Sequence, residues 1–137
     1  MPHRLVTLER TIIDRDGTVL PAVFGTIVAG TPVEACVNVF DATNQRFACG
    51  VWECSPGIVA MTDWPYDEFC ILLTGRVVIT PTAGPAQDYA QGDAFVIPKG
   101  FSGTWDIRET VRKYYAIQKH PGPLGTLKAA LRRLLSR

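Results

Sequence analysis

The sequence predicts an all-β fold, an antiparallel sandwich or barrel, on two observations. From about residue 20 to residue 118, segments of alternating apolar and polar residues follow one another, and they are rich in β-branched and aromatic side chains. Turn-forming stretches separate these segments, and no helical pattern lies between them. The expected strands cover residues 33–41, 47–54, 68–81, 93–98, 103–109 and 111–118.

Three parts of the chain have different expected roles. Residues 1–32 form an N-terminal arm that contributes edge strands, and residues 33–119 form the barrel. Residues 120–137 begin with prolines and glycines, after which Thr126 can cap a short amphipathic helix. We expect this helix to pack on the barrel or on a symmetry mate, with docking to a partner or a membrane surface as the alternative. Its apolar stripe consists of Leu127, Leu131, Leu134 and Leu135.

Composition limits the classes of function. With 137 residues, 47% of them hydrophobic and 20% charged, the chain is long and apolar enough to fold around one core. A net charge of +1 gives no basic face for nucleic acid, and no apolar run is long enough to cross a membrane. The N-terminus does not resemble a secretory signal, so we expect a cytoplasmic protein with reduced thiols. Its cysteines, none in a C-x-x-C pair, are Cys36, Cys49, Cys54 and Cys70.

Two segments of the barrel have a specific spacing. Glu68 begins a strand that ends at Gly75, and both faces of this strand are apolar beyond Glu68, which predicts burial on both sides. A buried glutamate needs a metal, a cation or hydrogen bonds. Gly92 is followed by Pro98 and Gly100, which make the turns into and out of a short strand. The spacings E-x6-G and G-x5-P-x-G together resemble the two-part signature of the cupin superfamily.

The resemblance to cupins extends from about Val33 to Ile117. The segments GVWECSPG, DEFCILLTG, GDAFVIPKGFSGTW and VRKYYAI are similar to small single-domain cupins related to (S)-ureidoglycine aminohydrolase, many of which have no assigned function. The resemblance implies an all-β jelly-roll β-barrel, here with a short C-terminal α-helix. It also implies a homodimer, with any site inside the mouth of the barrel.

The metal-ligand positions of cupins are occupied here by other residue types. In metal-binding cupins the first motif reads H-x-H-x3,4-E, and a further histidine lies three residues beyond P-x-G. With four intervening residues, the first two ligand positions fall on Met61 and Asp63. With three, they fall on Thr62 and Trp64. The last position falls on Gly103.

We therefore expect no cofactor and no usual cupin metal site. Neutral imidazole supplies most of the affinity of such sites, and the two histidines, His3 and His120, lie outside the barrel segments. The sequence does not exclude that Asp63 and Glu68 bind a divalent ion weakly. The absence of histidines from the ligand positions also argues against metal-assisted hydrolysis with release of ammonia, the best-known activity of the subfamily. In that reaction the metal supplies the activated water.

Glu68 and Lys113 are the candidate catalytic residues. If Lys113 points into the barrel, it would pair with Glu68 in place of a metal. A lysine in an apolar pocket can have its pKa lowered enough to act as a base or nucleophile. The alternatives are that Glu68 pairs with a cation at the rim or caps backbone amides, and that Lys113 faces solvent.

A wider set of residues is expected to line the pocket. By the cupin pattern, the face of Gly103 and Trp105 looks into the barrel opposite Glu68, and Gly103 leaves room for an open pocket. The aromatic residues could equally be core, and Cys70 could be an inert filler. The full set is Trp52, Asp63, Trp64, Tyr66, Cys70, Gly103, Trp105 and Tyr115.

Three functions are compatible with this sequence. The first is a cupin that binds a small polar metabolite, such as an anionic or ureido-like compound, without catalysis. The second is an amidohydrolase, lyase or isomerase for a small nitrogenous or sugar-like compound, using Glu68 and Lys113 or weak metal assistance. The third is a structural or regulatory dimer whose C-terminal helix docks elsewhere. Loss of the histidines favours binding over metal-dependent turnover.

Overall fold

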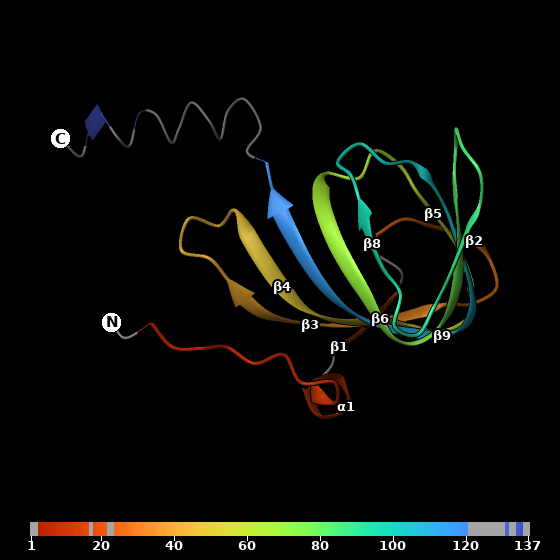
Figure 1. Cartoon of the computed structure of the whole chain (residues 1–137), viewed down its shortest axis with the longest axis horizontal. Coiled ribbons are helices and arrows are strands. Elements are labelled where there is room, and N and C mark those ends of the chain that lie inside the picture. Colours follow the sequence, from red (N-terminus) through yellow and green to blue (C-terminus); the bar gives the residue numbers. More distant parts are fainter. Residues whose placement is uncertain (1–2, 17, 22–23, 121–130, 132–133, 136–137) are drawn as a thin grey trace.

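The computed structural model describes residues 3–16, 18–21, 24–120, 131 and 134–135, and most of this part of the chain is β-structure (Figure 1). The predicted all-β class is confirmed. Within the described residues no helix is long and apolar enough to cross a membrane. The elements are α1 (Ile12–Asp16), β1 (Thr18–Pro21), β2 (Thr26–Ala29), β3 (Val33–Asp41), β4 (Phe47–Cys54), β5 (Gly57–Met61), β6 (Tyr66–Pro81), β7 (Gln87–Ala90), β8 (Ala94–Ile97) and β9 (Gly103–Lys119).

The strands form one antiparallel sheet that curls on itself. Neighbouring strands follow the order β1-β3-β4-β9-β5-β2, while β6 pairs with β7, β8 and β9. Figure 1 shows β3 and β4 extending from one side of the curl and β2, β5, β6 and β8 enclosing the other. The predicted strands at 103–109 and 111–118 are one continuous strand, β9, and the sequence patterns did not indicate β5 or β7.

The long strands β6 and β9 hold the two parts of the sheet together. The first half of β9 pairs with β5 and with the end of β6, whereas its second half pairs with β4 and with the start of β6. The register of β6 shifts between Leu72 and Val77. Gly75 lies within this shift at a φ of 86°, and a side chain there would collide with the carbonyl of Thr110. Glycine at the end of the first motif is therefore a requirement of the bend.

The second motif encloses the short strand β8 between two tight turns. Gly92 and Gly100 both have a φ of 90°, which glycine adopts without strain. The backbone N–H of Gly92 donates to the carbonyl of Leu72, and Leu72 donates back to the carbonyl of Asp93. These bonds fix the turn before β8 against the middle of β6, so the two motifs lie side by side in the sheet.

The two faces of β6 differ in burial. Glu68, Cys70 and Leu72 are all buried on the inner face. On the outer face Phe69 is 49% exposed, so the expectation that both sides of this strand are buried is wrong there. Two apolar faces indicate burial on both sides only when something covers the second one.

The N-terminal arm contributes a strand to each end of the strand order. From the N-terminal arm, β1 lies at one end of the strand order and β2 at the other. Before β1 the arm crosses the outer face, where Tyr114 donates to the carbonyl of Leu8 and Arg112 bonds to Asp14. The predicted helix over 120–137 lies outside the described residues, apart from three helical positions with exposed side chains: Leu131, Leu134 and Leu135.

Candidate functional site

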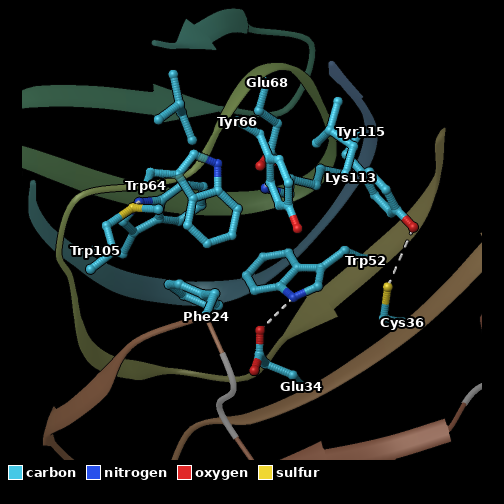
Figure 2. Close-up of a pocket in the computed structure, with 13 residues that line it drawn as sticks. Phe24, Glu34, Cys36, Trp52, Trp64, Tyr66, Glu68, Trp105, Lys113 and Tyr115 are labelled. Carbon is cyan, nitrogen blue, oxygen red and sulfur yellow. Dashed lines mark hydrogen bonds and ion pairs between the residues drawn. The ribbon is translucent and has the colours of Figure 1, made fainter. Parts of the chain in front are cut away.

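A cavity of about 200 Å³ lies inside the curl of the sheet (Figure 2). It takes side chains from β3, β4, β5, β6, β8 and β9 and from the segments that precede β2 and β6. Most of these side chains are apolar or aromatic. The lining residues are Phe24, Glu34, Cys36, Trp52, Met61, Trp64, Tyr66, Glu68, Ile97, Trp105, Lys113, Tyr115 and Ile117.

A buried ion pair crosses one wall of this cavity. Lys113 Nζ lies 2.6 Å from Glu68 Oε2, and the side chains are only 7% and 5% exposed. Lys113 points inward because it lies two residues after the buried Val111 on the same face of β9. Its ammonium also lies 4.7 Å from the ring centroids of both Trp52 and Trp105. The pair and the two rings thus compensate for removing both charges from water.

The protonation states of this cluster follow from its contacts. Burial acts to lower the pKa of Lys113, but the neighbouring Cys70 and Glu68 raise it, and the net direction is upward. Burial raises the pKa of the Cys70 thiol to about 12. The thiol donates to Glu68 Oε2 over 3.0 Å. The expectation that Lys113 has a lowered pKa is therefore wrong, and its charged form is favoured.

The tryptophans of the chain, three in all, line the cavity and differ in their hydrogen bonding. Trp52 Nε1 donates to Glu34 Oε1 over 2.7 Å, and Trp105 Nε1 contacts Met61 Sδ at 3.0 Å. Trp64 Nε1 is buried and has no hydrogen-bond partner among the described residues. Two of the three indole donors are therefore satisfied by the protein, and the third is not.

The structure brings together most of the residues predicted for the site and leaves out three. Cys70 is fully buried behind the ion pair, and Asp63 is exposed in a turn, where its backbone N–H donates to Ser102 Oγ. Gly103 does not open the pocket, because a side chain there would collide with the carbonyl of Thr80. It would also come within 2.8 Å of Phe101 Cζ, so neighbouring atoms already fill the space beside Gly103.

Several lining residues were not identified from the sequence. The most informative is Glu34, which is 2% exposed and accepts the indole hydrogen of Trp52. A glutamate in the mostly apolar stretch VEACVNV was an available signal, because it shares a face of β3 with Cys36. The remaining additions are mainly apolar and carry no such signal: Phe24, Cys36, Met61, Ile97 and Ile117.

The donor set does not fit a divalent metal. Glu68 is committed to the ammonium of Lys113, whose charge would repel a cation. Met61 and Trp64 present a thioether and an indole to the cavity, and Asp63 is not among the lining residues. Within the described ranges no group of three or more His, Cys, Asp or Glu side chains is placed to hold a metal. His120 bonds instead to Asp67, with Nε2 2.7 Å from Oδ2.

The outer face of the same strands carries an exposed apolar row, which we call the outer row. Its members are directly paired across β3, β4, β9, β6 and β8. Phe69 is 49% exposed and Val96 60% exposed. A shallow groove runs along this face, and Arg46 and Asp67 also line it. The outer row consists of Phe40, Cys49, Ala116, Phe69 and Val96.

The curled antiparallel sheet, the two glycine-terminated motifs and the cavity enclosed between them define a cupin. The chain belongs to the family described as the EutQ-like cupin domain, whose model matches residues 42–115. No curated protein matches it.

Solved structures support the same fold. A DUF861-family protein of unknown function from Pseudomonas syringae pv. tomato str. DC3000 is 23% identical with a TM-score of 0.66, over 81% of this chain and 46% of that one. This chain thus spans about half of that protein. EutQ from Clostridium difficile is 22% identical with a TM-score of 0.56, over 64% and 69% of the two chains. The cupin domain of Cnp3 from Schizosaccharomyces pombe is 20% identical with a TM-score of 0.56, over 72% and 70%. Such identities show the fold alone.

Proposed function

We propose that this cupin binds a small molecule in the aromatic cavity without the help of a metal. The observation that carries this proposal is the Glu68–Lys113 pair, which supplies its own counter-charge inside a wall of tryptophans. A cavity of about 200 Å³ is smaller than the ~300–1,000 Å³ pockets that hold drug-sized ligands, so the ligand is small. The largely apolar and aromatic lining favours a ligand with an apolar or planar body, whereas the sequence led us to expect a small polar metabolite.

The cavity offers less support for the enzymatic alternative. The raised pKa of Lys113 leaves it no lone pair to accept a proton or attack a carbon at neutral pH. Cys70 is a buried thiol rather than a thiolate, since burial raises its pKa to about 12. No histidine is among the lining residues of the described chain. A binding role needs none of these groups to react.

Intrinsic fluorescence tests the proposal, because Trp52, Trp64 and Trp105 all line the cavity. Titration with a library of small aromatic and heterocyclic fragments is expected to give saturable changes in emission for some of them. Glu68→Gln and Lys113→Met should weaken the binding of those fragments, whereas Asp88→Asn, at an exposed ion pair that is not part of the cavity lining, should not. The proposal is wrong if no fragment saturates, or if every hit binds both cavity variants as it binds the wild type.

Two further parts of the proposal concern relationship and location. We propose that the chain is related to the (S)-ureidoglycine aminohydrolase-type cupins, supported by the four segments quoted above. This relationship does not extend to metal-assisted hydrolysis, because Met61, Asp63 and Gly103 occupy the ligand positions. We also propose a reducing compartment such as the cytoplasm, which is supported by four cysteines that all have free thiols.

We propose that the outer row contacts a second copy of this chain. Apolar side chains aligned across several strands form a contiguous exposed surface, which is typical of a protein interface. The groove along the row carries Arg46 and Asp67, which have opposite charges. A two-fold axis brings the same patch of both copies together, so Arg46 of each copy can face Asp67 of the other. This supports the homodimer expected from the sequence.

A further inference from the structure

We infer that Trp64 selects the ligand, and that the ligand is a neutral planar molecule with a carbonyl beside an N–H, as in a carboxamide or a lactam. The inference rests on the proposed binding function and names the class of molecule that the cavity takes. It begins with the indole hydrogen of Trp64, which is buried without a partner in the described part of the chain, while those of Trp52 and Trp105 have one. A buried donor without an acceptor is costly, so a ligand that supplies the acceptor gains affinity.

Trp64 is held in place at both its backbone and its ring. Its backbone N–H donates to the carbonyl of Phe101 over 2.9 Å, and its own carbonyl accepts from Gly100 over 2.7 Å. Its ring packs edge-on against Tyr66, with centroids 5.5 Å apart, and against Phe24 at 6.5 Å. The indole therefore cannot turn toward water without breaking these contacts, and its donor is fixed before any ligand arrives.

Glu68 supplies the matching acceptor. Its Oε2 accepts from Lys113 and from Cys70, whereas Oε1 accepts no hydrogen bond from the described residues. Figure 2 shows Trp64, Tyr66 and Glu68 on the same side of the cavity. A ligand that lies between them meets a donor on Trp64 and an acceptor on Glu68. An adjacent carbonyl and N–H satisfy both at once.

The charges of the lining favour a neutral ligand. Glu68 and Lys113 already balance each other, so neither offers an unpaired charge. An anionic ligand would approach the carboxylates of Glu34 and Glu68, and a cationic ligand would approach the ammonium of Lys113. The rings of Trp52, Trp64 and Phe24 contribute flat apolar surface, which favours a planar ligand body.

A matched series of probes tests this inference: benzamide, acetophenone, benzoate and benzylamine. They share a phenyl ring, but only benzamide is neutral with both a carbonyl and an N–H. Benzamide is expected to bind about tenfold or more tightly than acetophenone, which lacks the donor to the Glu68 carboxylate. Trp64→Phe keeps a six-membered aromatic ring and removes the pyrrole ring of the indole with its N–H. This change is expected to weaken the binding of benzamide by several-fold up to about tenfold.

Nuclear magnetic resonance gives a readout that does not depend on a variant. The chain has three tryptophans and therefore three indole N–H signals, and benzamide is expected to move that of Trp64 downfield more than the other two. If Trp64→Phe does not fold, this shift in the wild type decides the question, with the signals assigned through space. An unmoved Trp64 signal at saturation would overturn the inference.

The outcomes separate this inference from the proposed function. Equal binding of benzamide and acetophenone, unchanged by Trp64→Phe, would overturn the ligand class while leaving a binding cavity in place. Tighter binding of benzoate or benzylamine than of benzamide would overturn the inference that the ligand is neutral. Failure of all four probes and of the fragment library would contradict the proposed function itself.

Discussion

Lys113 Nζ lies 2.6 Å from Glu68 Oε2 inside the barrel, and this contact takes the place that a metal ion would need. It gives the Glu68 carboxylate a partner although the residue types that bind a metal in other cupins are missing here. The ammonium is further held between the rings of Trp52 and Trp105, each with its centroid 4.7 Å away. The pair is therefore a structural part of the cavity wall as well as a candidate contact for the ligand.

Removing either partner of this pair should destabilise the protein strongly. Lys113→Met leaves the buried carboxylate of Glu68 uncompensated, and Glu68→Gln leaves a buried ammonium. Each is expected to lower the free energy of unfolding by about 3–5 kcal/mol, measured by urea denaturation. The double variant Glu68→Gln/Lys113→Met should lose less than the sum of the two single changes, because neither charge is then left alone.

An exposed pair serves as the control for this prediction. Arg76 and Asp88 form an ion pair whose side chains are 52% and 50% exposed. Asp88→Asn should lower the free energy of unfolding by less than about 1 kcal/mol, because water screens such pairs. Additive losses in the Glu68 and Lys113 double variant would show that the two residues do not stabilise one another.

The sequence predicted the positions that backbone geometry and alternation decide. Gly75 was found by its spacing from Glu68, and the structure requires a glycine there because Thr110 leaves no room for a side chain. The alternation of the last strand placed Lys113 on one face with Tyr115 and Ile117, and whether that face points inward was left open. The spacing and the alternation both depend on residues that are close in the chain.

Features that depend on distant neighbours could not be predicted in this way. The space at Gly103 is filled by Thr80 and Phe101, and no local pattern shows this. Phe24 reaches the cavity from the N-terminal arm, where its ring lies 5.4 Å from that of Trp52. The burial of Phe69 was overestimated because the arm covers a different part of the same outer face.

Gly103→Ala should destabilise the protein rather than reshape the cavity. The added methyl group would meet the carbonyl of Thr80 and approach Pro81 Cα to 3.0 Å, and backbone atoms cannot move aside easily. A loss of about 2–3 kcal/mol in the free energy of unfolding is expected from such overpacking. Gly84→Ala is the control, since its nearest atom is Pro81 Cβ at 3.6 Å, and it should change stability by less than about 0.5 kcal/mol. Equal stability of the two variants would mean that Gly103 does have room beside it.

Stability should fall at alkaline pH because of two buried thiols. Burial raises the pKa of both Cys54 and Cys70 from 9.0 to about 12. Above pH 9 the unfolded chain therefore loses protons that the folded chain keeps, so the free energy of unfolding decreases as pH rises. The slope should approach about 1.4 kcal/mol per pH unit for each thiol. The raised pKa of Lys113 acts in the same direction at still higher pH, because the folded state again holds a proton that the unfolded state releases.

Urea unfolding in the presence of a reductant, repeated between pH 8 and pH 10.5, measures this slope. Cys70→Ala should reduce this slope by the contribution of one thiol. The difference separates the titration of Cys70 from that of other groups. Cys49→Ala is the comparison, because that thiol is only half-buried and should contribute less. A slope that Cys70→Ala leaves unchanged would show that the Cys70 thiol ionises equally in both states.

Phe69→Glu should convert the proposed homodimer into a monomer. Phe69 lies in the outer row between Ala116 of β9 and Val96 of β8, and its exposed ring is available to a second copy. A carboxylate there would have to be buried without a partner in the dimer, which costs far more than it does at an exposed position of the monomer. The molar mass from light scattering coupled to size-exclusion chromatography should therefore halve, while the far-ultraviolet circular dichroism stays the same.

Val28→Glu is the control. It lies at a 58% exposed position on the edge strand β2, away from the outer row, and should leave the molar mass unchanged. A monomeric wild type, or a Phe69→Glu variant that keeps the dimer mass, would mean that the outer row is not the contact between copies.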